Sequence, residues 1–273
     1  MTNGKLLQGV VVCGALSLLA RAASANTITI GDFEPPTYSA TGSFLNIDGW
    51  FDSNGAPPLI ANVSPVGFIP AISGTQSAAV LSISTGFLGA AAKSVSGAPL
   101  SDGAELSWLV SQQQGTQTSS QSALFFTNDL AGQTEPAGLL VSESFGVQVR
   151  SSTGLAESTD QVLQFTMGPG IGTPSDVMRM RMVLNFTDST FTAFAENLTD
   201  GIGPVQLTTP THPGGVFPWV TSGAGPGVLL HSGESTAIYD DIRLQLFAVP
   251  EPGTMLLLGP GAVGLLRRRG KFV

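Results

Sequence analysis

The stretch that decides the fold is residues 177–196, which read VMRMRMVLNFTDSTFTAFAE. In its first half Arg179 and Arg181 share one face, and the apolar side chains share the other: Met178, Met180, Met182, Leu184 and Phe186. This period of two is typical of a β-strand, because successive side chains point to opposite faces. Thr187-Asp188-Ser189 then turn the chain into a second run that begins at Phe191. We therefore predict a β-hairpin with one face in a core and the other in water.

The same alternation recurs elsewhere between Gly, Pro, Asn, Asp and Ser residues, while helical periodicity is almost absent. Further strands are expected at 27–30, 78–84, 104–111, 123–127, 146–150, 161–167 and 237–247. Residues 112–121 are predicted to form a polar loop, and 201–227 a connection rich in Pro and Gly. The methionine stripe has no nearby His or Cys, which favours core packing over metal binding. Residues 26–248 thus predict one all-β domain, an antiparallel β-sandwich.

The first 25 residues have the organisation of a secretory signal peptide. Lys5 precedes an apolar segment at 6–20, and Ala23-Ser24-Ala25 supplies the small residues of a cleavage site. Such a signal implies export through the Sec translocon. The chain's one cysteine, Cys13, lies inside this segment, so the body has no thiol for disulfide formation.

The last 25 residues, 249–273, contain three consecutive parts. The first, 249–254, contains Pro250, Glu251 and Pro252, and its prolines end the preceding strand and leave the chain extended. The second, 255–266, is an apolar helix by expectation, and at twelve residues it is shorter than the roughly 20 that span a bilayer. The third, 267–271, contains Arg267, Arg268 and Arg269, and such positive charge is retained on the cytoplasmic side of a membrane.

In order and position these parts resemble the PEP-CTERM sorting signal of Gram-negative bacteria. The resemblance implies export, transient anchoring in the inner membrane through the tail, and handling by an exosortase. It also implies delivery to the cell surface or to the extracellular matrix, with exopolysaccharide as a partner. The alternative is a hydrophobic C-terminus with incidental arginines. We thus expect a signal peptide at 1–25, a sandwich domain at 26–248 and a sorting tail at 249–273.

The body between these ends is strongly acidic. It holds five basic residues, Lys93, Arg150, Arg179, Arg181 and Arg243, against 18 acidic ones, a net charge of −13. A surface of this charge repels phosphate backbones, which argues against nucleic-acid binding.

Short motifs at both ends of the body, Asp32-Phe33-Glu34, Asp48-Gly49-Trp50 and the closing Tyr239-Asp240-Asp241-Ile242-Arg243-Leu244, resemble those of the jelly-roll family of concanavalin A-like and carbohydrate-binding modules. The resemblance implies that the first and last strands lie close together, with Glu34 near Asp240.

The candidate metal site consists of acidic residues from these motifs. Period two places Asp240 on the same face as Ile242, which must point to the core, and Asp241 on the other. An inward carboxylate needs a cation, several N–H donors or access to water. A hard cation such as Ca²⁺ suits carboxylate oxygens, and the resemblance implies a structural calcium at Glu34, with Asp240 and Asp241. In the alternative, Asp240 accepts hydrogen bonds from a neighbouring loop and Asp241 is solvated.

Aromatic side chains are the candidate platforms for a sugar ring, and Trp219 in its Pro/Gly-rich loop is the best placed of them. Its alternative role is to pack that loop onto the body. Enzyme motifs are lacking: neither His212 nor His231 accompanies a Gly-x-Ser-x-Gly motif or a His-Glu-x-x-His motif, and no Glu-x-Asp-x-x-Glu spacing occurs.

We therefore expect a non-enzymatic exported protein with a structural or adhesive role. The alternatives are a carbohydrate-binding jelly roll with a structural Ca²⁺ and, less favoured, a glycoside hydrolase.

Overall fold

The computed structural model describes residues 26–38, 43–52, 59–64, 71–82, 89–95, 103–113, 121–127, 130, 137–142, 146–158, 175–220, 225–233 and 236–247. Thr27–Leu246 form one compact unit. The predicted signal peptide, the sorting tail and the strand expected at 161–167 lie outside the described residues. No helix suited to crossing a membrane is found in the described ranges.

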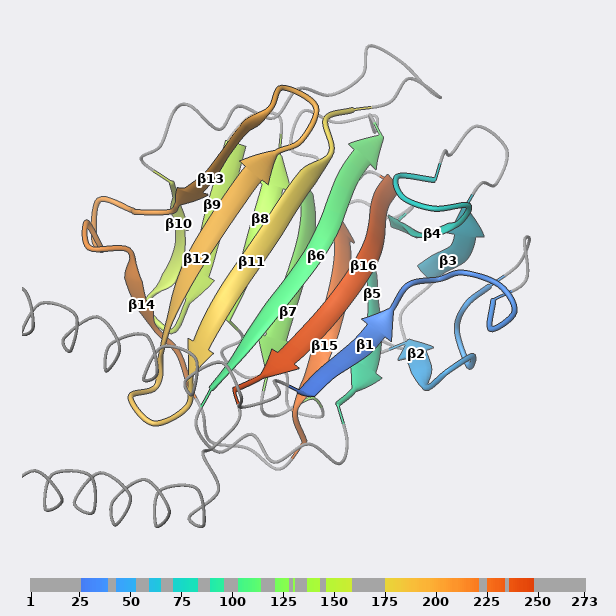
Figure 1. Ribbon diagram of the computed structural model, residues 1–273, viewed down its shortest axis with the longest axis horizontal. Helices are drawn as coiled ribbons and strands as arrows, with labels where there is room; N and C mark the ends of the chain where they lie inside the picture. The colour runs from blue at the N-terminus through green and yellow to red at the C-terminus, as the bar shows by residue number, and fades with distance from the viewer. Residues whose placement is uncertain are drawn as a thin grey trace, which may run out of the picture. The chain divides into compact units, whose positions relative to one another are not determined.

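The regular structure of the unit consists of β-strands arranged in two sheets (Figure 1). The larger sheet has nine strands, seven of which follow one another from edge to edge: β13 (Ile202–Gln206), β12 (Thr190–Asn197), β11 (Met178–Asn185), β6 (Gly103–Gln113), β16 (Thr236–Leu246), β4 (Ser77–Ser82) and β3 (Leu59–Ser64). In addition, β1 (Asn26–Gly31) pairs with β16, and β14 (Val216–Pro218) pairs with β12.

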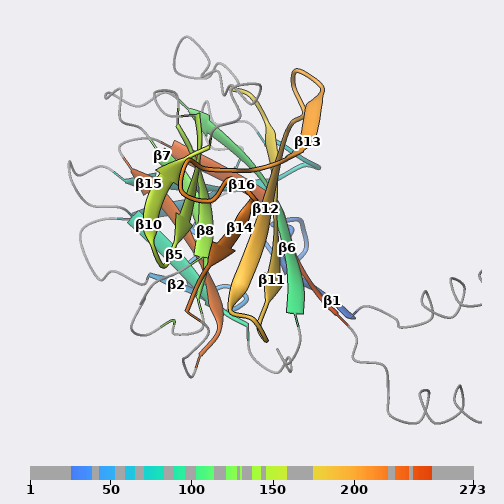
Figure 2. The same cartoon turned by 90° about the vertical axis from the view of Figure 1, so that its left-hand side faces the viewer.

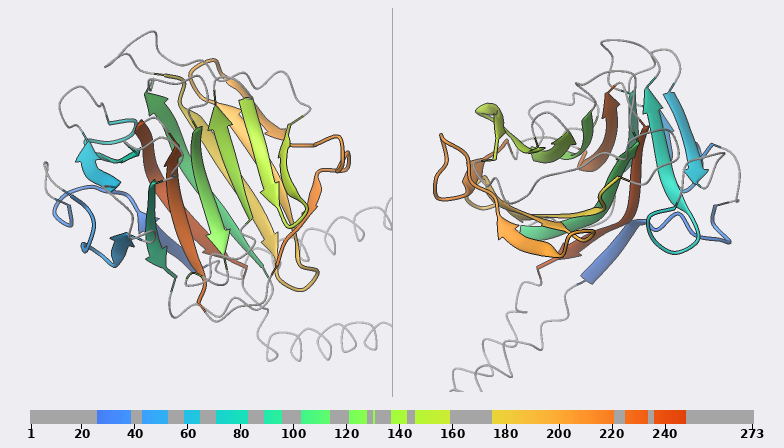
Figure 3. Two further views of the ribbon diagram at one scale, coloured as in Figure 1. Left: turned by 180° about the vertical axis from the view of Figure 1, so that it is seen from behind. Right: turned by 90° about the horizontal axis from the view of Figure 1, so that it is seen from above.

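The smaller sheet has seven strands. From edge to edge they are β10 (Gly154–Glu157), β9 (Gly146–Ser151), β8 (Ala137–Ser142), β7 (Gln121–Thr127), β15 (Gly227–Gly233), β5 (Gly89–Ser94) and β2 (Trp50–Asp52). The two sheets lie against each other as two layers (Figures 2 and 3). The pairings for which a register is known are antiparallel in both sheets. The predicted antiparallel β-sandwich is confirmed.

The hairpin predicted at 177–196 is present as β11 and β12. Met180 lies opposite Ala195 and Arg181 opposite Phe194 in the antiparallel register. The four methionine and leucine side chains of β11 that were expected to point inward are buried in the core between the sheets, whereas Arg179 is exposed. The alternation of the sequence is thus the alternation of burial.

Tyr239 of β16 joins the two layers. Its side chain is fully buried, and its hydroxyl donates to the carbonyl oxygen of Ala123 on β7 at 2.8 Å and to that of His231 on β15. Ala123 and His231 are themselves paired across the smaller sheet. Burial of the phenol raises the pKa of Tyr239, which keeps the hydroxyl protonated as a donor.

Two of the strands that were not predicted, β8 and β15, are buried on both faces. Their inner side chains enter the main core, and their outer ones join a second apolar cluster: Ala92, Ala123, Phe125, Leu130, Leu140 and Leu229. A strand buried on both sides has no alternation of apolar and polar residues, so the period-two signal is lost. The prediction of 201–227 as a plain connection is also wrong, because this stretch contains β13 and β14.

The core position of Met180 gives a first prediction. The side chain is 1 % exposed, and Met180→Ala leaves a cavity, so we expect a loss of about 2–5 kcal/mol in the free energy of unfolding. The matched variant Met180→Leu conserves volume and is expected to cost less than about 1.5 kcal/mol. Urea denaturation followed by tryptophan fluorescence measures both values. Equal costs for the two variants would contradict the packing described above.

Candidate functional site

The pairing of β1 with β16 brings Glu34 to the loop that precedes β4. The Glu34 carboxylate accepts hydrogen bonds from the backbone N–H groups of Thr75 (2.6 Å) and Gln76 (3.1 Å) and from the Thr75 hydroxyl. Partial desolvation acts to raise the pKa of Glu34, but these hydrogen bonds outweigh it and hold the pKa below its usual value. A side chain at Gly74, where φ is +53°, would collide with this carboxylate. Glu34 thus fastens the loop after β1 to the loop before β4.

A β-bulge in β16 changes the orientation of Asp240. Asp240 lies opposite Leu109 and Arg243 opposite Ser107, so Asp241 and Ile242 together face the single residue between these partners on β6. The extra residue inverts the alternation along β16. The prediction that Asp240 shares the core face with Ile242 is therefore wrong: Asp240 lies on the outer face of the sheet. Asp241, in the bulge, has a φ of 51°.

Asp240 is nevertheless only 2 % exposed. Its carboxylate accepts hydrogen bonds from the Ser77 hydroxyl at 2.9 Å and from the backbone N–H of Asp241 at 2.7 Å. Burial raises the pKa of Asp240 to about 7; these hydrogen bonds counteract the rise, and the negative charges of Glu34 and Asp241 add to it. The expected proximity of Glu34 to Asp240 is thus present in the structure.

All three acids have partners within the protein. The oxygens of Glu34 and Asp240 accept hydrogen bonds from the protein, and Asp241 pairs with the Arg243 guanidinium at 2.6 Å. Within the described ranges, no three His, Cys, Asp or Glu side chains are grouped so as to hold a metal ion. The structure corresponds to the hydrogen-bonded alternative for Asp240, and calcium binding stays a prediction.

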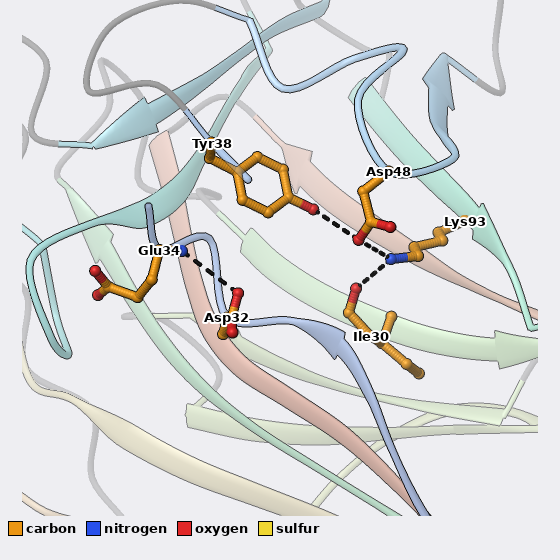
Figure 4. A network of polar contacts seen from close by, with 6 residues as sticks. All are labelled: Ile30, Asp32, Glu34, Tyr38, Asp48 and Lys93. Carbon is orange, nitrogen blue, oxygen red and sulfur yellow. Dashed lines mark hydrogen bonds and ion pairs between the residues drawn. The ribbon is translucent and has the colours of Figure 1, made fainter. Parts of the chain in front are cut away.

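A second polar network connects β1, the loop after it and β5 (Figure 4). The Lys93 ammonium donates to the carbonyl oxygen of Ile30 at 2.7 Å and to the Asp48 carboxylate at 2.5 Å, and Tyr38 donates to the same carboxylate at 3.1 Å. The backbone N–H of Glu34 donates to Asp32 at 3.4 Å. Because these partners hold one another, the network serves to position the loop.

Trp219 is not a platform for a ligand. Its side chain is 3 % exposed and packs edge-on against Phe126 and Phe186, with ring centroids 5.8 Å and 5.3 Å away. The prediction of ligand stacking by Trp219 is corrected in favour of its alternative, loop packing. The other two tryptophans and both tyrosines are buried as well: Trp50, Trp108, Tyr38 and Tyr239. No tryptophan or tyrosine of this chain therefore offers an exposed ring to a sugar.

The two histidines have different surroundings. His231 on β15 is buried beside Phe125, and desolvation lowers its pKa to about 4, so it is neutral at physiological pH. His212 lies in a turn, where its Nδ1 is 3.0 Å from the Thr211 hydroxyl.

The outer face of the larger sheet carries a groove of about 290 Å³. It crosses β6, β11, β12 and β13 and is lined by Glu105, Ser107, Arg179, Arg181, Phe194, Ala195, Glu196 and Pro204. Arg179 pairs with Glu196 at 2.9 Å, and Arg181 pairs with Glu105 at 3.4 Å. The sequence placed both arginines on the wet face of a strand. It did not reveal their partners, because those depend on the register of strands distant in the chain.

Comparisons with known proteins concern the tail and the fold. Residues 248–269 match the model of the PEP-CTERM protein-sorting motif, which confirms the predicted resemblance of the tail to this signal. The matched range contains Pro250, Glu251 and Pro252. No curated protein matches the sequence.

Among solved structures, a carbohydrate-binding module from Bacillus subtilis is similar, with a TM-score of 0.43, 11% identity, and coverage of 72% of this chain and 95% of that one. Lectin II from Ulex europaeus has a TM-score of 0.44 and 9% identity, with 81% and 97% covered. The globular domain of T. cruzi calreticulin has a TM-score of 0.43 and 10% identity, with 90% and 99% covered. At such identities the likeness concerns the fold alone.

The buried Asp240 predicts a specific pH dependence. Its pKa is about 7 in the folded protein against an ordinary 3.8, so the folded state retains a proton that the unfolded state releases. The stability from Asp240 is present below about pH 4. It is lost as the pH rises through 7, at about 1.4 kcal/mol per unit of pKa difference.

Asp240→Asn removes this contribution, since its side chain stays neutral. We expect the unfolding free energy of the wild type, relative to that of the variant, to fall between pH 4 and pH 8 in urea titrations. His231 titrates equally in both proteins and cancels. A parallel pH dependence of the two proteins would show that Asp240 is ionised in the folded state throughout.

Proposed function

We propose that this protein is an exported, exosortase-sorted component of the cell surface or extracellular matrix, with a structural or adhesive role and no catalytic activity. The observation that carries the proposal is the PEP-CTERM motif at 248–269. A motif of this kind marks a protein for export and for transient membrane anchoring through its C-terminal tail, with an exosortase as the sorting partner. Exopolysaccharide is the matrix component that we propose as its surroundings.

The polar chemistry of the body supports a non-catalytic role. The hydrogen bonds of Glu34, Asp240 and Lys93 hold loops or strands to one another. His231 is buried and its pKa is far below that of a general base working near neutral pH. Groups used in this way stabilise a fold and are not free to exchange protons with a substrate.

The alternative is a carbohydrate-binding module with a structural Ca²⁺ at Glu34, Asp240 and Asp241. It predicts that Ca²⁺ raises the melting temperature of the chelated protein, and that Asp240→Asn abolishes the rise. Mg²⁺ serves as the control cation, since it prefers a smaller octahedral site. A melting temperature unchanged at saturating Ca²⁺ would contradict the structural calcium site.

The sorting proposal is tested by fractionation of the native host and mass analysis of the mature C-terminus. We expect a chain that ends within 250–254 and is found at the surface or in the medium. Replacing Pro250, Glu251 and Pro252 with Ala should leave the intact chain in the membrane fraction, because the processing enzyme lacks its motif. The control is Asp52→Ala, which removes an exposed acid of the body and should be sorted normally. Recovery of the wild type from the cytosol with Val273 attached would contradict the proposal.

A further inference from the structure

The groove on the outer face of the larger sheet is built from one row of facing residues and the ion pairs beside it. Ser107 on β6, Arg181 on β11 and Phe194 on β12 lie opposite one another in the antiparallel register. Arg179 and Glu196 form the adjacent row. Because residues in register on neighbouring strands share a face, these side chains stand together on the surface.

The groove presents both hydrogen-bond donors and acceptors. The arginine side chains are 53% and 37% exposed, whereas their partners Glu196 and Glu105 are 24% and 27% exposed. The guanidinium carbon of Arg181 lies 4.1 Å from the centroid of the Phe194 ring, a cation–π contact that restrains the side chain. Each guanidinium has five N–H donors, and a single carboxylate does not use them all. Each carboxylate likewise has more acceptor positions than the one guanidinium contact uses.

The charges of the groove select the chemistry of its ligand. Two arginines and two glutamates give no net charge, on a body whose net charge is −13. An anionic ligand would have to compete with Glu105 and Glu196 for the guanidiniums, and a cationic one with the arginines for the carboxylates. A neutral ligand with adjacent hydroxyl groups displaces neither, because each hydroxyl both donates and accepts. It bridges a guanidinium N–H and a carboxylate oxygen, while Pro204 and the edge of Phe194 supply apolar contacts.

We infer that this groove binds a short neutral saccharide segment, held by Arg179, Arg181, Glu105 and Glu196. Its volume of about 290 Å³ is just below the range of roughly 300–1,000 Å³ typical of ligand pockets, which suits a short segment. The site involves neither Trp219 nor the acids of the predicted calcium site. Saccharide binding at the groove would specify the proposed adhesive role. The inference rests on that proposal, because only an exported protein meets extracellular saccharide.

The test is affinity electrophoresis of the exported protein, purified from its host, in gels that contain dextran, soluble starch or mannan. We expect retardation by at least one of these neutral polymers, with little change between low and high salt because no net charge is neutralised. Arg181→Ala should weaken the retardation roughly tenfold by removing a charged donor. Arg150→Ala is the matched control, since it removes an exposed arginine of the other sheet and should bind as the wild type does.

A second variant blocks the groove and preserves its ion pairs. Ser107→Trp places a large ring directly beside Arg181, at the β6 end of the row. We expect it to abolish retardation while circular dichroism and melting temperature show a folded protein. Retardation by none of the neutral polymers overturns the inference, as does retardation confined to alginate or dextran sulfate and lost in high salt. Unchanged binding in both groove variants also overturns it. These results leave the sorting proposal untouched, since that proposal is tested by the location and mass of the mature chain.

Discussion

The structure depends on the way β16, the last strand, is held at the centre of the larger sheet. It pairs with β6 along one edge and with β4 and β1 along the other, so segments from both ends of the body meet on it. The buried hydroxyl of Tyr239 extends this attachment to the second layer through the carbonyl oxygens of Ala123 and His231. An unpaired hydroxyl or carbonyl in such a dry interior is costly, so these bonds fix the relative position of the two sheets.

The bulge in β16 lets Tyr239 and Ile242 both face the core, which strict alternation along a regular strand would not allow. Tyr239 points into the core before the bulge, and Ile242 and Leu244 point into it afterwards. The inserted residue leaves Asp240 on the outer face, where Ser77 and the loops anchored by Glu34 enclose it. The hydrogen bonds of Glu34 and Asp240 thus attach loops and strands at the centre of the sheet. Burial among like charges makes a proton the simplest neutralising partner of Asp240.

The sequence predicted the elements in which one face is wet and the other dry. The alternation of Met180, Arg181 and Met182 predicts a strand with one buried face and one exposed face, and the hairpin and the sandwich were predicted from it. Strands β8 and β15 escaped prediction because both of their faces are buried. The orientation of Asp240 could not be predicted, since a bulge is a property of register between strands and not of spacing along one. For the same reason Glu105 and Glu196 became partners of the arginines only once β6, β11 and β12 were aligned.

The distribution of aromatic and charged residues then decides how this body can adhere to anything. Its tryptophans and tyrosines are all buried, so none of them forms an exposed stacking surface. Its net charge opposes polyanions over long distances. Adhesion then depends on short-range contacts. The charges of an ion pair cancel at long range, but in direct contact the pair still offers hydrogen-bond donors and acceptors. Arg179 and Arg181, two of the five basic residues of the body, stand in such pairs on one face. A body with this surface would bind uncharged polar polymers in preference to polyanions, because uncharged polymers approach it without electrostatic repulsion.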